Sequence, residues 1–305
     1  MGRGPQSALD PGADHASAVY DLSLVLFIGG GAIFAAVMAL ALYAVLARPE
    51  RFPGGRAWVY GGGILFPVVT LTVLQVYEFG VARRLSAPGG PDTLRVEVVG
   101  FMWWWEVRYP EGILTANAIV IPAGRPVEFV VTTADVIHSF WIPNLAGKID
   151  MIPGHVNRLT LTANRPGTYR GQCAEYCGAQ HTRMAFDVTV LPPARFADWL
   201  AGQGRPAPEP ADPVLVAGRD AFLKAGCGEC HAVRGTPAAG TRGPDLTHVG
   251  SRPSLAAGTF PNGVGALAGW IAGAQHLKPE NRMPSFGTLD GETLRAMAAW
   301  LESLK

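Results

Sequence analysis

Two long apolar segments near the N-terminus constrain this 305-residue chain more than any other feature. Residues 22–46 carry no charged side chain, and residues 57–77 form a second uncharged segment with Pro67 inside it. As helices rising about 1.5 Å per residue, both would cross about 30 Å of hydrocarbon. Buried core helices would show the same pattern, and a signal peptide would explain the first segment alone. That segment is too long for a signal and lacks an A-x-A-like site after it. We therefore predict a transmembrane hairpin with helices at about 22–46 and 57–81.

The connection between the two segments is basic, with arginines at positions 48, 51 and 56. Connections of this kind lie in the cytoplasm by the positive-inside rule. Arg83 and Arg84, just after the second segment, weaken that assignment. We expect residues 1–18 to form an exposed tail, so that residues 1–91 comprise a tail and a membrane hairpin.

The periodicity changes to that of β-strands after residue 85. Alternating or β-branched runs end at Gly or Pro breaks, as in RVEVVG, PVEFVVTT, RLTLTA and FDVTVL. Such runs predict an all-β, predominantly antiparallel sandwich or barrel. A short amphipathic helix through Phe196, Trp199 and Leu200 would complete a domain at 92–200. The net charge of +1 gives no indication of a nucleic-acid partner.

A proline-rich stretch separates this β domain from the rest of the chain. GQGRPAPEPADP has few apolar residues, which predicts a semi-rigid linker at 201–213. Beyond it, residues 214–305 indicate an all-α domain of short helices. The last of these is marked by the helical spacing of Leu294, Met297, Ala298 and Leu301.

Soft metal donors are concentrated in CAEYCGAQHTRM, residues 173–184. Zinc sites have no use for methionine, whereas copper accepts thiolate, imidazole and thioether. A single blue-copper site needs one Cys, two His and a weak Met, so the second cysteine suggests two coppers bridged by both sulfurs. His138, in ADVIHSFWIP, supplies the second imidazole. A disulfide between Cys173 and Cys177 is the alternative, but it would leave the histidines and the methionine unexplained.

The loop resembles the binuclear CuA site of subunit II of haem-copper cytochrome c oxidases, whose pattern C-x-E-x-C-G-x-x-H-x-x-M it matches throughout. The resemblance implies a cupredoxin-like Greek-key domain behind a two-helix membrane hairpin. It also implies that both cysteines bridge two coppers, that each histidine binds one copper, and that one backbone carbonyl and one thioether complete the set. The implied ligands are His138, Cys173, Glu175 (through its carbonyl), Cys177, His181 and Met184. The Glu175 carboxylate would face a magnesium shared with subunit I.

Residues around this loop extend the resemblance. GFMWWWEVRY is similar to the family's aromatic segment, in which the first tryptophan, here Trp103, receives the incoming electron. For Trp104 and Trp105, a place in the sandwich core is as well supported as a function. PNLAGKIDMIPG resembles a stretch near the interface between subunits. The chain departs from the family between Arg56 and Pro67, where it lacks the glutamate often found at the mouth of a proton path; Glu50 is the nearest upstream.

The remaining cysteines lie in AGCGECHAV, which contains the C-x-x-C-H pattern of covalent haem c attachment. A redox-active C-x-x-C is the alternative. Cys227 and Cys230 would form the thioethers, and His231 and Met283 (in RMP) would bind the iron axially; a thioether opposite a histidine suits electron transfer. GPDL resembles the cytochrome c loop whose proline carbonyl accepts the N–H of the proximal histidine. We expect Met297, on an apolar helix stripe, to be core.

Taken together, these features predict subunit II of a cytochrome c oxidase with a fused C-terminal cytochrome c domain. Covalent haem is attached outside the bacterial cytoplasm, which places both redox domains and both termini on the periplasmic side of the inner membrane. The resemblance implies subunit I as partner, with subunit III and a donor such as cytochrome c or quinol–cytochrome c reductase. The same subunit could serve a CuA-containing nitric oxide reductase, and a copper-storage or delivery protein is the alternative from a different class.

Overall fold

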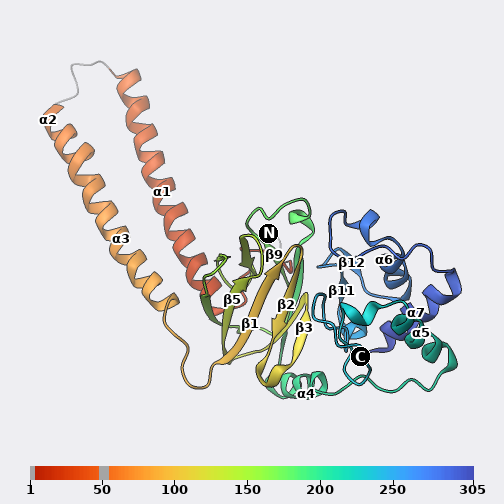
Figure 1. The fold of residues 1–305 in the computed structure, drawn as a ribbon. Coiled ribbons are helices and arrows are strands. Elements are labelled where there is room, and N and C mark those ends of the chain that lie inside the picture. Colours follow the sequence, from red (N-terminus) through yellow and green to blue (C-terminus); the bar gives the residue numbers. More distant parts are fainter. Residues whose placement is uncertain (1–3, 48–54) are drawn as a thin grey trace.

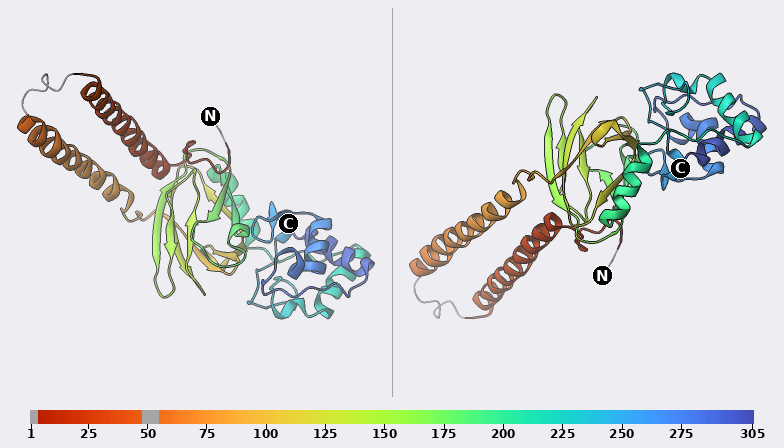
Figure 2. Two further views of the ribbon diagram at one scale, coloured as in Figure 1. Left: turned by 90° about the horizontal axis from the view of Figure 1, so that it is seen from above. Right: turned by 90° about the horizontal axis from the view of Figure 1, so that it is seen from below.

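The structure is a computed structural model that describes residues 4–47 and 55–305. Three parts follow one another in space as they do in sequence: a pair of long helices, a β domain and a helical domain (Figures 1 and 2). Arg48, Glu50 and Arg51, which entered the sequence argument, lie outside the described residues.

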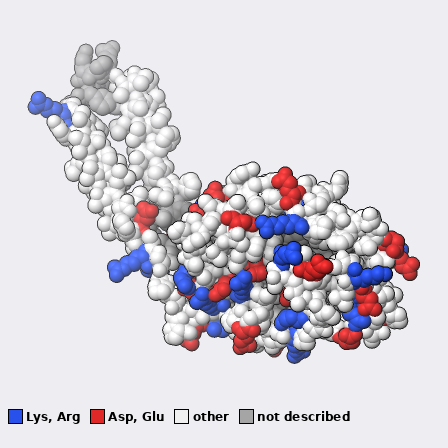
Figure 3. All heavy atoms as spheres, viewed as in Figure 1, with Lys and Arg blue, Asp and Glu red and all other residues white. Residues whose placement is uncertain are grey.

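The two apolar segments form long helices that project from the β domain (Figure 1). The first is α1 (Asp14–Leu46), and the second runs through α2 (Gly55–Ala57), the π-helical η2 (Trp58–Leu65) and α3 (Phe66–Leu85). The π-helical stretch ends where Phe66 N–H bonds to Gly61 O, just before Pro67, which has no N–H to donate. Both helices are long and apolar enough to cross a membrane. Their shafts are almost free of charge (Figure 3).

The N-terminal residues do not form the exposed tail expected from the sequence. Ala13 is fully buried and forms a β-bridge with Ala163. Gly12 N–H donates to Asn144 O at 2.7 Å, and Thr162 N–H donates to the Asp14 carboxylate at 2.8 Å. The described part of the segment therefore lies along the β domain and fixes the start of α1 to it.

The β domain is a sandwich of two five-stranded sheets. One sheet has the order β3-β2-β1-β5-β8 and contains β1 (Leu94–Phe101), β2 (Trp104–Arg108), β3 (Leu114–Ala116), β5 (Pro126–Thr133) and β8 (Asn157–Thr162). The other has the order β4-β10-β9-β6-β7 and contains β4 (Ala118–Pro122), β6 (His138–Trp141), β7 (Ile149–Met151), β9 (Gly167–Cys173) and β10 (Ala185–Leu191). Pairing is antiparallel except between β1 and β5 and between β4 and β10. The predicted all-β sandwich is confirmed.

Aromatic side chains fill the space between the sheets. Trp105 is fully buried, and its ring lies 5.0 Å from Phe186 and 6.1 Å from Phe140 in edge contacts. Phe140 stacks on Phe186 at 4.9 Å. Trp104 points the other way and stacks on Phe101 at 4.6 Å, as the alternation of a strand requires. Trp105 is therefore a core residue.

Helix α4 (Pro193–Gln203) and the linker connect the two domains. The predicted amphipathic helix is confirmed, although it extends into the range predicted for the linker. The linker lies against the helical domain: Ala207 N–H donates to Arg234 O at 2.8 Å, and His248 Nε2 lies 3.1 Å from Arg205 O. The proline-rich stretch is thus held by backbone hydrogen bonds at several points.

The C-terminal domain consists of α5 (Pro213–Lys224), α6 (Val264–Leu277) and α7 (Gly291–Ser303), with a minor ladder of β11 (Ser254–Leu255) and β12 (Phe260–Pro261). Helices α5 and α7 touch at Gly218, where a Cβ would lie only 2.0 Å from Ala296 O. Met297 is fully buried in the core of this domain, as expected, and Phe222 contacts Trp300 edge-on at 5.1 Å. The fold class predicted from the sequence is confirmed.

Candidate metal centre

The predicted copper donors meet at one end of the inner strands of the second sheet. His138 begins β6 and Cys173 ends β9, and these strands pair with Phe140 opposite Cys173. The loop after β9 contains Cys177, passes through the 3-10 turn η4 (His181–Arg183), and returns to the sheet at β10 directly after Met184. The sandwich therefore fixes both ends of the loop, and the sequence spacing places the other donors inside it.

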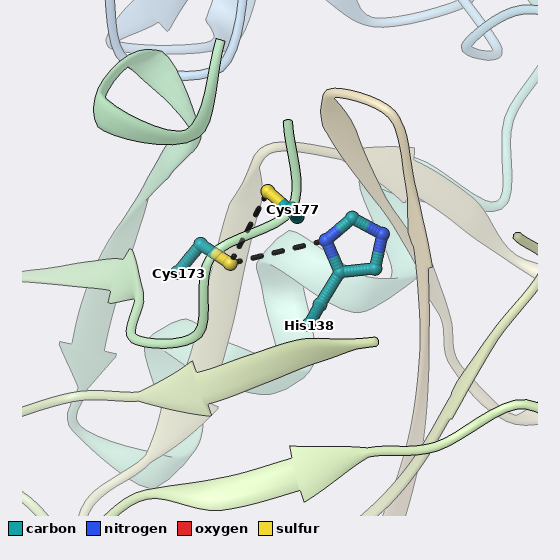
Figure 4. A group of neighbouring side chains, drawn as sticks. All are labelled: His138, Cys173 and Cys177. Atoms are coloured by element: carbon teal, nitrogen blue, oxygen red, sulfur yellow. Dashed lines mark hydrogen bonds between the residues drawn. The ribbon is translucent and has the colours of Figure 1, made fainter. Parts of the chain in front are cut away.

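Three donor side chains, from two histidines and a methionine, converge on two free thiols. His138, Cys173 and Cys177 form a compact buried cluster (Figure 4). The sulfurs of the two cysteines are 3.7 Å apart, far beyond the roughly 2.05 Å of a disulfide bond, so they are not joined. The other distances are 3.8 Å from Cys173 Sγ to His138 Nδ1, 3.6 Å from Cys177 Sγ to His181 Nδ1, and 3.8 Å from Cys177 Sγ to Met184 Sδ. Each histidine thus faces a different sulfur.

A partly buried carboxylate that was not predicted from the sequence orients His138. Asp135 Oδ1 lies 2.9 Å from His138 Nε2, which leaves Nδ1 directed at Cys173. The second carboxylate oxygen of Asp135 accepts from Met102 N–H at 2.8 Å. Burial raises the pKa of Asp135, but the hydrogen bonds from His138 and two backbone N–H groups outweigh it and lower the pKa. A carboxylate on the outer nitrogen is the usual support of a metal-binding histidine.

The electrostatics of the thiol pair favour a cation between them. The hydrogen bond with Cys177 lowers the pKa of Cys173 against the effect of burial. The same contact, together with burial, raises the pKa of Cys177. Without a metal, the second thiol cannot ionise beside the first, because two buried like charges repel. A positive ion bound by both sulfurs removes this penalty, so the free, buried, soft donor set fits a copper pair.

Of two further predicted residues, Glu175 lies on the same loop and Trp103, between β1 and β2, contacts it. Trp103 is 5% exposed, and its Nε1–H donates to Cys177 O at 2.8 Å. A Cβ at Gly178, where φ is +105°, would lie 3.2 Å from the Trp103 ring, so the glycine allows this close contact. Glu175 O lies 3.2 Å from Cys173 Sγ, whereas its carboxylate is exposed and 3.3 Å from Lys148 Nζ. The carbonyl and the side chain of Glu175 therefore face different surroundings.

The predicted haem residues lie on two loops of the helical domain. Cys227 lies in the 3-10 turn η5 (Cys227–Glu229), with Cys230 and His231 just after it. His231 Nδ1 lies 2.8 Å from Pro244 O, the contact expected from the GPDL resemblance. Met283 N–H donates to Asn281 Oδ1 at 2.7 Å, which shapes the other loop.

All four haem residues are half-buried, unlike the fully buried cysteines of the copper loop. Burial lowers the pKa of His231, which favours the neutral imidazole that an iron ligand must be. Burial also raises the pKa of Cys227 to about 11, as is usual for an unreacted thiol without a cationic neighbour. The residues fit covalent haem c, because thiols and imidazole come from one turn and the thioether from a separate loop.

The interface between the copper and haem domains, called the seam below, contains a lysine whose role no sequence spacing predicted. Lys278, directly after α6, is 2% exposed, and its ammonium donates to Trp103 O in the β domain at 2.8 Å. Apart from Met283, no predicted ligand lies within thirty residues of Lys278 in the sequence. The only feature that could have indicated its importance is its place in the segment leading to that methionine.

Comparisons with known proteins match both domains. The family profile "Cytochrome C oxidase subunit II, periplasmic domain" matches residues 112–191, and the profile "Cytochrome c" matches residues 215–305. A cytochrome c oxidase subunit 2 of Alkalihalophilus pseudofirmus is 34% identical over 320 residues, which covers 100% of this chain and 92% of that protein. A protein of the same name from Bacillus sp. strain PS3 is 32% identical over 79% of this chain and 71% of its own. The crystal structure of the periplasmic domain of subunit II of cytochrome oxidase of Bradyrhizobium japonicum is 30% identical, covers 38% of this chain and 95% of its own, and has a TM-score of 0.36.

Proposed function

Since this chain belongs to the family of cytochrome c oxidase subunit II and carries a cytochrome c domain, we propose that it is the electron-input subunit of a proton-translocating haem-copper oxidase. Electrons would pass from haem c to the binuclear copper centre and on to the haem of subunit I, where oxygen is reduced to water. The observation that supports this most directly is the convergence of two histidines and a methionine on two unbridged, buried thiols.

In this proposal the copper loop holds the metal pair from all sides. Cys173 and Cys177 would bridge the two ions, each histidine would bind one ion through Nδ1, and Met184 and the carbonyl of Glu175 would be weak ligands. When bound, the pair supplies a one-electron carrier. The chain itself contributes the rigid loop ends on β9 and β10, the Asp135 support of His138, and burial that excludes water.

The haem would be attached through Cys227 and Cys230, with His231 and Met283 as axial ligands. The contact between His231 and Pro244 O would hold the imidazole in one orientation, and Asn281 would fix the backbone of the methionine loop. Trp103 would be the point at which the electron reaches the copper domain, because its ring lies on the copper loop and its carbonyl faces the haem domain.

The membrane arrangement follows from these assignments. The two apolar helices would cross the bacterial inner membrane twice, with both termini and both redox domains on the periplasmic side. We infer a functional division into a tail and hairpin (1–91), copper domain (92–200), linker (201–213) and haem domain (214–305). Subunit I would contact the copper domain, with a magnesium ion facing the Glu175 carboxylate. Subunit III and cytochrome c or quinol–cytochrome c reductase are the further partners we propose.

Metal analysis of the purified complex tests the copper assignment. We expect two coppers per haem c beyond the copper of subunit I, and a near-infrared copper absorption band, in the wild type. Cys173→Ser should remove both, because the serine hydroxyl cannot bridge two soft metals. Tyr176→Phe is the matched control, since Tyr176 is 75% exposed in the same loop. Zinc, or no copper beyond that of subunit I, in correctly assembled wild type would overturn the proposal.

Gas consumption separates the two possible catalytic partners. An oxidase complex consumes oxygen with reduced cytochrome c as donor, whereas a complex with a nitric oxide reductase subunit consumes nitric oxide. The relatives named cytochrome c oxidase subunit 2 favour oxygen.

A further inference from the structure

Lys278 uses all of its hydrogen-bonding capacity in the seam between the two redox domains. Its Nζ donates to Trp103 O at 2.8 Å, to Arg183 O at 2.8 Å and to Ala256 O at 3.0 Å. The first two acceptors belong to the copper domain and the third to the haem domain. An ammonium has three N–H donors, so none is left over. Among the residues that the structure describes, no carboxylate forms an ion pair with Lys278.

A buried lysine of this kind is costly, which makes its position informative. Lysine is almost never fully buried unless it is paired. Here burial, followed by the charge of Arg183, lowers the pKa of Lys278 to about 7, while Cys177 acts in the opposite direction. The three carbonyl oxygens favour the ammonium and offset part of the desolvation. A leucine or methionine at the same place would avoid this cost but would not join the domains.

The contacts of Lys278 continue on both sides toward the two redox sites. On the copper side, Trp103 Nε1–H donates to Cys177 O at 2.8 Å. On the haem side, Asn281 Nδ2 donates to Lys278 O at 2.6 Å, and Asn281 Oδ1 accepts from Met283 N–H at 2.7 Å. A series of hydrogen bonds, connected through Asn281, Lys278 and Trp103, therefore runs from the methionine loop to the cysteine loop.

Other contacts show that the seam has a defined geometry. Gln180 Nε2 donates to Pro279 O at 3.0 Å, and Ala185 N–H donates to Ala257 O at 3.0 Å. Ala256 and Ala257 have φ of 52° and 60°, a left-handed conformation that costs a non-glycine residue free energy. This strained turn directs its carbonyl oxygens at Lys278 and at the first residue of β10, so it is shaped to fit the copper domain.

We propose that Lys278 is a positioning residue that holds the haem domain against the copper domain at Trp103, so that electron transfer between them needs no docking step. This inference rests on the electron route proposed above. The step oxidises one ferrous haem c and reduces the copper pair by one electron, and no bond or proton is transferred. Lys278 contributes a fixed distance and orientation to this step.

Lys278→Met in the complete oxidase complex tests the proposal, with Lys224→Met as the matched control because Lys224 is an exposed lysine of the same domain. After rapid reduction of haem c, we expect transfer to copper to slow by about tenfold or more, as when reacting groups lose their alignment. The transfer should also become dependent on solvent viscosity, because the domains must now find each other. Wild type and Lys224→Met should show no viscosity dependence.

Hydrogen exchange gives a readout that does not depend on electron transfer. The Ala185 N–H, which donates across the seam, should exchange faster in Lys278→Met than in the control. The haem c spectrum and the near-infrared copper band should be unchanged. Equal transfer rates and equal exchange in the two variants would overturn the role of Lys278.

Acylation of the wild type keeps the proposal falsifiable if Lys278→Met does not assemble. In the native complex, an amine-acylating reagent should modify Lys224 and leave Lys278 unmodified until the protein is unfolded. Comparable modification of both lysines would contradict a locked seam. If reduced haem c fails to reduce copper in the wild type, the electron route fails, whereas the exchange and acylation results still report on the seam.

Discussion

The copper and haem domains hold their candidate ligands in opposite ways. His138, Cys173 and Met184 are at most 2% exposed, and Cys173 and Met184 belong to the core of the sandwich. Cys230, His231 and Met283 are only half-buried; the first two are adjacent, and Met283 lies on a separate loop. The first site is therefore part of the sandwich core, whereas Cys227 and Met283 of the second pack against the outside of the helical core. We expect the copper domain to fold largely without its metal, and the haem domain to need its haem.

Removal of the haem attachment should have the largest effect and would test this contrast directly. Cys227→Ala combined with Cys230→Ala should eliminate covalent haem. It should also destabilise the haem domain by more than about 4 kcal/mol, the free energy from a ligand present at a thousandfold above its dissociation constant. Limited proteolysis of the complete complex should cut the haem domain and spare the copper domain.

Chelation of copper is the matched experiment for the other domain. The chelated wild type should remain resistant to protease over 92–200, because the core around Trp105 and Phe140 does not involve the metal. Cleavage within the copper domain after chelation, or a protease-resistant haem domain without haem, would contradict the comparison.

Truncation of an aromatic side chain in the sandwich core should have the next largest effect on stability. Trp105→Ala should lower the free energy of unfolding of the copper domain by about 3–5 kcal/mol, because it leaves a large cavity between the sheets. Trp104→Ala is the control in the next position and should cost less than about 1.5 kcal/mol, the scale of one aromatic stacking contact. Chemical denaturation followed by tryptophan fluorescence measures both, and similar losses would show that the core does not depend on Trp105.

The carboxylate of Asp135 faces the nitrogen of His138 that points away from Cys173, a support that a chance cluster of metal donors would not need. Asp135→Asn keeps the shape but removes the negative charge that the outer nitrogen of His138 faces, so copper affinity should fall about 10- to 100-fold. Competition with a chelator measures the change. Glu128→Gln on β5, which alters an exposed ion pair with Arg158 on β8, should leave affinity unchanged. An unaltered affinity in Asp135→Asn would mean that the sandwich alone orients the imidazole.

The same contrast explains what the sequence could predict. The copper loop is contiguous, so the spacing of Cys173, Cys177, His181 and Met184 already implied a shared site. Asp135 lies only three residues before His138, but that spacing alone does not show that its carboxylate faces the imidazole. Lys278 acts through Trp103, which is 175 residues away, and no local pattern encodes such a contact. Only the fold brings them together.

Segment boundaries were predicted less well, for a physical reason. Hydropathy marks only the apolar part of a helix, which matches the thickness of the hydrocarbon layer. Helix α1 begins at Asp14, well before the apolar run, so hydropathy alone does not show where the helix starts. The residues before it contain few large apolar side chains, so composition suggested a tail. Their order comes from backbone hydrogen bonds to Asn144 and Leu145, which composition does not reveal.

The smallest expected effect concerns the first turn of α7 in the haem domain. Asp290 caps this helix by accepting from Glu292 N–H and Thr293 N–H at 3.0 and 2.9 Å. These bonds, chiefly those from Thr293, lower the pKa of Asp290 below its ordinary value of 3.8. The cap therefore stabilises the folded state above that value, and its contribution is lost as the pH falls through the lower pKa of the folded state. Asp290→Ala should lower the unfolding temperature of the haem domain slightly at neutral pH, whereas Asp290→Asn should preserve most of the cap because the amide oxygen still accepts. Calorimetry of the complete chain measures the difference. If Asp290→Ala unfolded the haem domain as fully as haem removal does, local helix capping rather than the cofactor would hold this domain together, and the contrast with the copper domain would have to be abandoned.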